Sequence, residues 1–413
     1  MTTTSPPQLA GSIEPRRSGE RRRRIGFAGM AWVSLSLSIA AAAPSPLYVL
    51  YQAEWGFASW LLGLAFSVYA FALLLALVTV GSLSDYLGRR PVLASAALAQ
   101  LTAMTLFLVA PNIGTVLAAR TLQGFATGVA TATVSAALTD LAPNRNRQLG
   151  AVIAGIAPLA GLSVGAISTG LIVHAAHTPI PIVFTALDVL FVIGLAVVVA
   201  APESVQRRGG AWKSLVPRLR IPPAARTAFV ASSLLNVAVW TTSGLCLGLV
   251  AVINRDVFDL HNGLANGGII ALVMGVSTAT AIVTRHLDAR SSGLIATTTL
   301  AAAAAGIGVG VVATNLVIYL VASVVAGIGV GTGFGGYIRL LTPTTGSEDR
   351  AELFTAMYVV SYLSFGLPVV AAGAFIDSAG PRPVITVFCA LTAVSAALGN
   401  LMLKRFASRG SDR

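Results

Sequence analysis

Charged residues are scarce in this sequence. They make up 10% of its 413 residues, and only 15 of those are acidic. A soluble domain carries about 25% charged residues, so this composition excludes an ordinary soluble protein. Hydrophobic residues reach 55%, with a mean hydropathy of +0.82. The chain is therefore expected to cross a membrane several times, with the lipid bilayer as its main partner.

Cysteine is also nearly absent. Cys246 and Cys389 both lie inside apolar runs, which predicts buried thiols rather than a disulfide framework or a metal site. The sequence contains no pairing of a nucleophile with a neighbouring base and no lysine-bearing phosphate loop. We therefore expect no enzyme activity, no cofactor and no metal.

The formal net charge is +12. Such a balance is compatible with nucleic-acid binding or with membrane loops that face the cytoplasm. Because the basic residues fall between apolar runs, we favour membrane loops and expect no nucleic-acid partner.

Apolar runs of roughly twenty residues mark candidate membrane spans. Twelve such runs follow one another along the chain: Ile25–Leu47, Trp60–Val80, Val92–Val109, Ile113–Leu138, Leu149–Val173, Ile180–Ala200, Thr227–Ile253, Leu264–Val283, Leu294–Val312, Leu316–Leu340, Leu353–Ile376 and Val384–Leu403. We expect Pro44 and Pro46 to bend or end the first helix. The predicted organisation is a disordered basic tail (1–24), a six-helix bundle (25–201), a cytoplasmic linker (202–226), a second six-helix bundle (227–405) and a short tail (406–413).

Lysine and arginine predict the orientation. One set of loops carries nearly all of them: the cluster at 21–24, Arg89, Arg90, Arg145, Arg147, six residues of the linker (Arg207, Arg208, Lys213, Arg218, Arg220, Arg226), Arg285, Arg290, Arg350, Lys404 and Arg405. The opposite loops contain only Arg255 and Arg382. This asymmetry places both termini in the cytoplasm, and we expect the cytoplasmic (inner) membrane of a bacterium.

Two short motifs and an internal duplication carry the functional signal. Residues 81–93 read GSLSDYLGRRPVL between the second and third spans, and the fourth span contains Arg120, Gln123, Gly124 and Gly128. A shift of 203 residues pairs Asp85 with Asp288, Gly124 with Gly327, Gly128 with Gly331, Arg147 with Arg350, and Gly170 with Gly373. Such a duplication predicts two bundles related by a pseudo-two-fold axis along the membrane normal.

These features resemble the major facilitator superfamily. The 81–93 stretch is similar to that family's loop signature G-x-L-x-D-x-x-G-R-[RK], and Arg120 to Gly128 is similar to its R-x-x-Q-G-x-x-x-G signature. The resemblance implies an all-helical membrane protein with twelve transmembrane helices in two pseudo-symmetric six-helix bundles. A third signature, found in drug/proton antiporters, is met only in part, since Gly161, Gly165 and Gly170 fit but Ala166 replaces its proline.

The resemblance also implies roles for single residues. Gly81, Asp85, Gly88, Arg89 and Arg90 would form a gating motif in which Asp85 faces the start of the eleventh helix; alternatively, Asp85 only caps its turn and pairs with Arg89 or Arg90. Arg120 would couple protons or bind an anionic group; alternatively, it snorkels to the outer interface.

Three further sets of residues complete the expected site. Asp188 is the one carboxylate well inside a predicted span, and it is either a proton site or part of a structural hydrogen bond. The implied central cavity would be lined by aromatic and polar side chains, which suits a lipophilic or weakly polar solute. The candidates are Trp32, Gln123, Thr127, Asn236, Trp240, Tyr337, Tyr358 and Tyr362. Alternatively, Trp240 and the tyrosines are interface-belt or packing residues.

The function that follows from the resemblance is secondary active transport by alternating access. We favour proton-coupled efflux of lipophilic or drug-like compounds by a monomer. A proton-coupled importer of a sugar or organic acid is the alternative, and a receptor or scaffold that transports nothing is the third reading.

Overall fold

All regular structure in the described part of the chain is helical. The computed structural model describes residues 14–143, 146–205, 208–210, 212, 215, 219–346 and 349–411. Its α-helices are α1 (Glu14–Ala42), α2 (Pro44–Trp55), α3 (Trp60–Val80), α4 (Ser84–Leu87), α5 (Arg89–Leu108), α6 (Ile113–Leu141), α7 (Gln148–Ala175), α8 (Pro179–Ala200), α9 (Arg226–Gly248), α10 (Val250–Phe258), α11 (Gly263–Val283), α12 (Ala289–Val312), α13 (Leu316–Leu341), α14 (Arg350–Ala379) and α15 (Pro381–Ser411). Short 3-10 turns occupy Pro223–Ala225, Thr284–His286 and Thr342–Thr344.

Eleven helical segments within the described residues are long and apolar enough to cross a membrane. The fourth predicted span, α6, is not among them, although it has 29 residues. Its polar side chains lower its hydropathy, and four of them (Arg120, Gln123, Thr127 and Thr133) are buried inside the protein rather than exposed to lipid. The fold class predicted from the sequence is confirmed.

The helix limits differ from the predicted ones at several points. The first helix is interrupted where Pro44 predicts it, since α1 ends at Ala42 and α2 begins at Pro44, but helix then continues to Trp55 rather than ending at Leu47. The N-terminal tail, expected to be disordered through residue 24, is helical from Glu14. Glu20 pairs with Arg24 one turn later at 2.8 Å, and Arg23 donates to the Asp140 carbonyl at 2.9 Å. At the other end, α15 extends to Ser411 where a tail was expected from residue 406.

Some of the predicted features lie outside the described residues. These are the tail at 1–13 and the basic side chains of Arg145, Arg207, Lys213 and Arg218.

Side-chain caps explain where several helices begin. The Asn112 side chain accepts the Thr115 N–H at the start of α6, and Asn262 and Asn315 do the same for α11 and α13. Such caps satisfy N–H groups that have no partner within the helix. In a membrane protein they allow short turns to connect successive spans.

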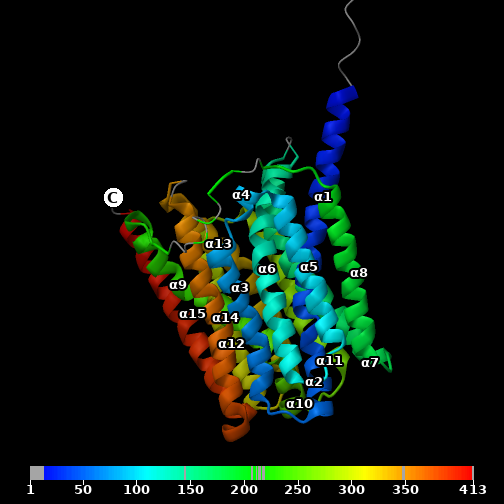
Figure 1. The fold of residues 1–413 in the computed structure, drawn as a ribbon. Coiled ribbons are helices and arrows are strands. Elements are labelled where there is room, and N and C mark those ends of the chain that lie inside the picture. Colours follow the sequence, from blue (N-terminus) through cyan, green and yellow to red (C-terminus); the bar gives the residue numbers. More distant parts are fainter. Residues whose placement is uncertain are drawn as a thin grey trace, which may run out of the picture.

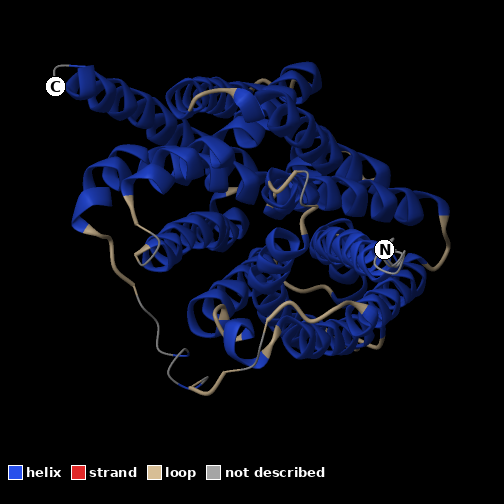
Figure 2. Cartoon of the chain, turned by 90° about the horizontal axis from the view of Figure 1, so that it is seen from above, coloured by secondary structure: helices blue, strands red, loops and turns tan. Residues whose placement is uncertain are grey.

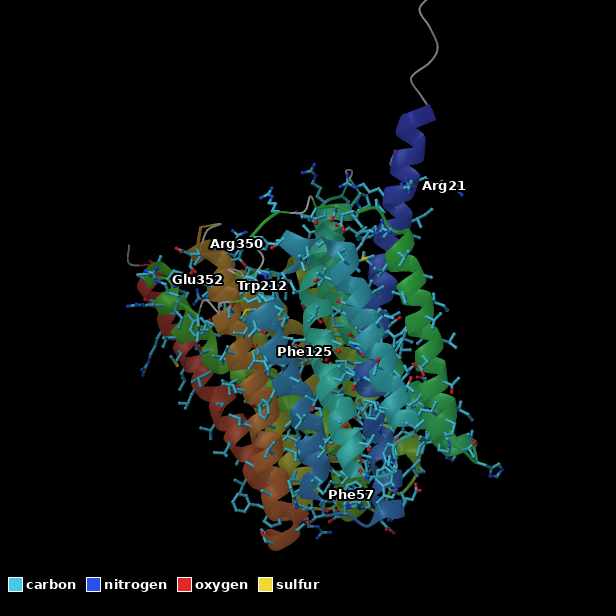
Figure 3. The ribbon with its side chains drawn as sticks, viewed as in Figure 1. Arg21, Phe57, Phe125, Trp212, Arg350 and Glu352 are labelled. Carbon is cyan, nitrogen blue, oxygen red and sulfur yellow. The ribbon has the colours of Figure 1, made fainter. Side chains whose placement is uncertain are left out.

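The helices form one bundle with both described chain ends on the same side (Figure 1). We call this side the α4 end, because α4 lies there. The short helices α2 and α10 lie at the opposite end (Figure 1). Figure 2 shows the same helices from above, at 90° to the view of Figure 1. Figure 3 shows that Phe57 lies at the end of the bundle opposite to Arg350 and Glu352.

The first half (α1–α8) and the second half (α9–α15) meet mainly through two helix pairs. In one, α7 packs against α11, and a Cβ added at Gly267 would lie 2.2 Å from the Ala166 carbonyl oxygen. In the other, α3 packs against α14, and a Cβ at Gly63 would lie 3.0 Å from the Val369 carbonyl oxygen. Glycine lets the two backbones approach this closely.

The two crossings are related by the duplication. Gly170 contacts Gly263 and Gly267 in the α7–α11 pair, and its counterpart Gly373 contacts Trp60 and Gly63 in the α14–α3 pair. Each crossing therefore joins the fifth helix of one half to the second helix of the other. This arrangement agrees with the pseudo-two-fold axis inferred from the sequence shift.

Adjacent glycines in α11 provide a direct test of the crossing. Gly267→Ala should destabilise the protein by about 1–3 kcal/mol, because the new methyl group overlaps the α7 backbone. Gly268→Ala, which has nothing within 4 Å of its added Cβ, should leave stability unchanged or raise it slightly. Thermal unfolding of the purified proteins in detergent measures both, and equal melting temperatures would contradict the crossing.

Candidate functional site

The loop of residues 81–93 is folded as a single charged cluster at the α4 end. The Arg89 guanidinium reaches the Asp85 carboxylate at 2.6 Å, the Ser84 hydroxyl at 2.6 Å and the Asp140 carboxylate at 3.5 Å. Only 13% of the Arg89 side chain is exposed. Arg90 donates to the Val199 carbonyl at the end of α8. The loop thus fastens α3 and α5 to α6 and α8 within the first half.

Glu203 completes this cluster from the chain that leaves α8. Its carboxylate accepts the backbone N–H groups of Arg89 at 2.9 Å and Arg90 at 3.0 Å, at the start of α5. A carboxylate at a helix N-terminus satisfies free donors and interacts favourably with the helix dipole. Gly88 has φ +96°, and a Cβ there would lie 2.7 Å from Glu203 Oε2. The glycine is needed both for the backbone conformation and for the approach of Glu203.

Asp85 is paired within its own half in this structure. Its side chain is 55% exposed, and among the described residues no hydrogen bond or ion pair joins it to α14. The pairing with Arg89 that the sequence left as an alternative is therefore present. The implied contact with the start of the eleventh helix stays a prediction.

The corresponding position in the second half is occupied by Asp288. Its carboxylate caps α12 by accepting the Ser291 N–H at 2.8 Å. Hydrogen bonding to that backbone N–H holds the pKa of Asp288 below its usual value.

Arg120 is buried inside the first half, with 1% of its surface exposed. It therefore does not snorkel to the outer interface. Its guanidinium carbon lies 5.2 Å from the ring centres of Tyr48 and Tyr69 and 6.0 Å from that of Phe107. Cation–π contacts of this kind stabilise a buried charge. No carboxylate pairs with Arg120 among the described residues.

The remaining hydrogen bonds of Arg120 and Gln123 stabilise the break between α1 and α2. Pro44 has no N–H, so the Ala40 carbonyl lacks its partner within the helix. Gln123 Nε2 donates to that carbonyl at 2.8 Å. Arg120 donates to the Ala41 carbonyl at 3.3 Å, to Gln123 Oε1 at 2.8 Å and to the Tyr48 hydroxyl. Gln123 thus replaces the hydrogen bond that Pro44 removes, and Arg120 adds further bonds beside it.

An aromatic cluster lies where α9, α13 and α14 approach α3. Trp240 has its ring centre 4.8 Å from that of Tyr362, 5.5 Å from Phe365 and 5.5 Å from Phe334. Phe365 in turn packs against Phe66 of the first half, with centres 4.7 Å apart. Trp240 Nε1 is buried and has no hydrogen-bond partner among the described residues. We call Trp240, Phe334, Tyr358, Tyr362, Phe365 and Phe66 the aromatic cluster.

The predicted cavity residues divide into groups. Trp240, Tyr358 and Tyr362 come together in the aromatic cluster. Asn236 and Tyr337 are 0% exposed in the interior of the second half, where Asn236 donates to the Ser361 hydroxyl at 2.9 Å, so they line no accessible wall here. Thr127 is buried against Gln100, and Trp32 is 37% exposed on α1.

Asp188 lies apart from both clusters, on α8. Its Oδ1 atom is buried and has no hydrogen-bond partner in the described residues. The structural hydrogen bond that the sequence left as an alternative is therefore not seen for this atom.

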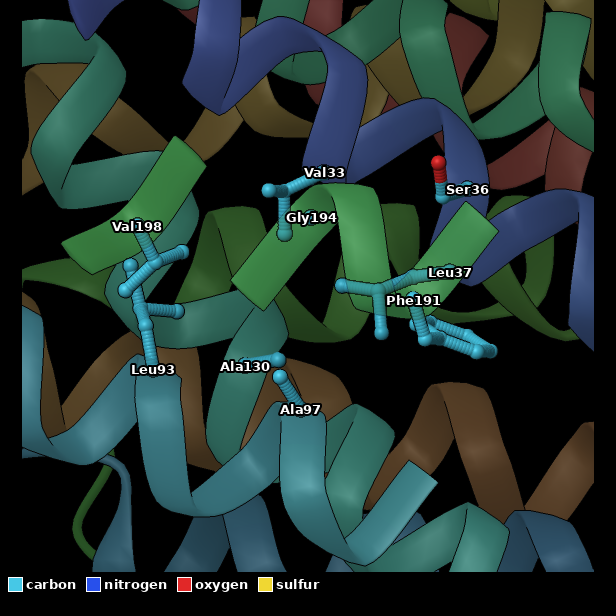
Figure 4. Close-up of a pocket in the computed structure, with 9 residues that line it drawn as sticks. All are labelled: Val33, Ser36, Leu37, Leu93, Ala97, Ala130, Phe191, Gly194 and Val198. Carbon is cyan, nitrogen blue, oxygen red and sulfur yellow. The ribbon is translucent and has the colours of Figure 1, made fainter. Parts of the chain in front are cut away.

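A pocket in the first half is not the predicted cavity. It is lined by apolar side chains of α1, α5, α6 and α8, with Ser36 as its one hydroxyl (Figure 4). Because all its walls belong to one half, it does not lie between the two bundles.

Comparisons with known proteins agree with this architecture. The family model described as Major Facilitator Superfamily matches residues 27–368. The chain belongs to the Major Facilitator Superfamily.

The fold comparison agrees. The crystal structure of the human organic anion transporter MFSD10 (TETRAN) superposes with a TM-score of 0.62 at 17% identity, covering 92% of this chain and 99% of that one. A search by sequence among curated proteins found no match. As a superfamily member, the chain is a multi-pass membrane protein and a secondary transporter.

Sequence reasoning missed four contributors to the site of this superfamily member. Asp140 and Glu203 complete the loop cluster, and Phe66 and Phe365 join the halves at the aromatic cluster. Glu203 carried one signal, as the sole acidic residue of the basic 202–226 linker. Asp140 is 51 residues from Arg89 and Phe66 is 299 residues from Phe365, so each pair meets only through the fold.

The variant Gln123→Leu tests whether the hydrogen bond from Gln123 to the Ala40 carbonyl stabilises the break between α1 and α2. The variant leaves the Ala40 carbonyl and one Arg120 donor unpaired, so we expect a loss of about 2–3 kcal/mol in stability. Thr121→Ala, on an exposed position of the same helix, removes only a bond to the Leu117 carbonyl and should be near neutral. Thermal unfolding compares the two, and a Gln123→Leu protein as stable as the Thr121→Ala protein would rule out this role.

Proposed function

We propose that this protein moves a small solute across the cytoplasmic membrane by alternating access, with twelve spans, α6 included, and both termini in the cytoplasm. The observation that carries the proposal is the uneven contact between the halves. Both glycine crossings lie toward the end away from α4, whereas Asp85 at the α4 end is bonded within its own half. This is the arrangement expected of a transporter closed to the outside and open to the cytoplasm.

We infer that Asp85 acts in gating. When the α4 ends of the halves close, Asp85 would exchange part of its pairing with Arg89 for the first turn of α14, where the helix dipole attracts an anion. The cluster around Arg89, Asp140 and Glu203 would keep the loop in place for that contact.

We favour proton-coupled efflux of a lipophilic or drug-like solute by a monomer. The aromatic cluster supports this preference, because stacked rings bind flat apolar molecules with little need for charge. Import of a sugar or organic acid is the second candidate. It is favoured by Arg120, a buried cation with no acidic partner among the described residues.

Flux in proteoliposomes tests both transport and gating. Under an imposed pH gradient, with lipophilic cations, antibiotics, sugars and organic acids as solutes, we expect movement opposite to the protons. Asp85→Asn should slow that flux about tenfold, corresponding to a coupling near 1.4 kcal/mol. Asp259→Asn is the control, because that side chain is 94% exposed and, within the described part of the chain, its ion pair is with His261.

The outcomes separate the candidates. Movement with the protons would favour the importer, and an unaffected Asp85→Asn protein would refute the gating role. A folded protein that moves none of these solutes would favour a receptor.

The coupling site is tested by neutralising Arg120 and Asp188 one at a time. If either one couples protons, its replacement by Gln or Asn should flatten the dependence of flux on the pH gradient while solute binding persists. Flux at several external pH values gives the measurement. Unchanged pH profiles for both variants would exclude both residues as coupling sites.

A further inference from the structure

The two broken helices meet at the end of the bundle away from α4. The helix pair α1–α2 breaks at Ala43, and its counterpart α9–α10 breaks at Leu249. Both outer segments, α2 and α10, lie together at the lower end of the bundle in Figure 1. One side-chain bond joins them: Arg255 Nη1 donates to Gln52 Oε1 at 2.7 Å.

Gln52 and Arg255 are counterparts in the duplication. They are separated by 203 residues, the same shift that pairs Asp85 with Asp288. Two residues related by a two-fold rotation can touch only where the axis passes between them. The bond therefore marks the point at which the pseudo-two-fold axis leaves this end of the molecule.

Both side chains are oriented before they meet. Asp256 accepts from Arg255 Nε at 2.6 Å and from Nη2 at 3.1 Å, which leaves Nη1 directed at Gln52. Gln52 in turn donates to the Phe57 carbonyl at 3.2 Å and to the Ser59 hydroxyl at 3.3 Å. A charge-assisted bond between two fixed partners is stronger than one between free side chains.

We propose that Gln52 and Arg255 form the outer latch of the transport cycle, with Asp256 as its positioning residue. The inference rests on the proposed alternating access. The latch is closed in this conformation, and it must break for α2 and α10 to separate and admit solute from the outside. Because it sits on the axis, any rotation that opens this end acts on it.

If the Gln52–Arg255 bond holds the outer end closed, its loss should favour the state that is open to the outside. The reporter is Ser67→Cys in a background lacking Cys246 and Cys389; Ser67 is 0% exposed and donates to the Gly366 carbonyl across the halves at 2.9 Å. A membrane-impermeant maleimide is added from the outside to right-side-out vesicles without solute. Arg255→Gln and Gln52→Ala should each raise the labelling rate about tenfold, a shift of 1.4 kcal/mol.

The double variant and a matched control sharpen the test. If the two residues act through one bond, Arg255→Gln with Gln52→Ala should label no faster than the faster single variant. Arg382→Gln removes the other arginine of the outer loops and should label at the parent rate. Parent-like labelling of both single variants, or additive effects in the double variant, would overturn the latch.

Folding is checked separately with Cys389 kept as the only cysteine. That thiol is 1% exposed on α15 and should stay unlabelled in every variant that is folded. If Cys389 is labelled in the Arg255→Gln protein, that variant is misfolded. The test of the latch then depends on Gln52→Ala, because this variant leaves the Arg255–Asp256 pair intact. Labelling needs no transported solute, so a protein that opens as expected but moves nothing would refute the proposed function and leave the latch standing.

Discussion

The need to satisfy every backbone carbonyl and N–H group away from water constrains this molecule most. Ordinary α-helices meet that need by themselves, but a transporter also requires helices that bend. Pro44 interrupts the first helix, and Gln123 supplies the bond that the proline removes. Arg120 adds bonds to Ala41 and Tyr48 and brings a charge that three aromatic rings surround. The polar motif of α6 is thereby tied to the shape of α1 and α2.

The same constraint divides the interface between the halves into two kinds of contact. Each crossing has one serine hydroxyl bond between the halves, from Ser67 to the Gly366 carbonyl and from Ser163 to the Ala271 carbonyl, but the glycines at 63, 170, 267 and 373 let the helix backbones lie against each other through apolar contact. Contacts of this kind are non-directional and can slide or part at low cost. The bond between Gln52 and Arg255 is directional, and the loop cluster around Arg89 is confined to one half. The glycine contacts are thus apolar, whereas the Gln52–Arg255 bond and the loop cluster around Arg89 are polar.

Much of the fold followed from the sequence, because apolar runs, basic loops and the 203-residue shift are properties of the chain itself. Local chemistry was not sufficient in two places. Pro44 correctly predicted an interruption of the first helix, but not that helix would resume at once and continue to Trp55. Neither could the sequence identify Glu203 as the partner of Arg89 and Arg90, since 114 and 113 residues separate them.

The contact on the pseudo-two-fold axis has a consequence for how such a chain could arise. In a symmetric pair of separate six-helix proteins, a residue on the axis meets its own copy. Two glutamines can bond in that setting, whereas two arginines repel. A pair of different residues at positions 52 and 255 requires both halves to be encoded in one chain, because each position can then be substituted without changing the other. A single chain that encodes both halves can therefore hold a charge-assisted contact at this point, which a homodimer of identical halves could not form.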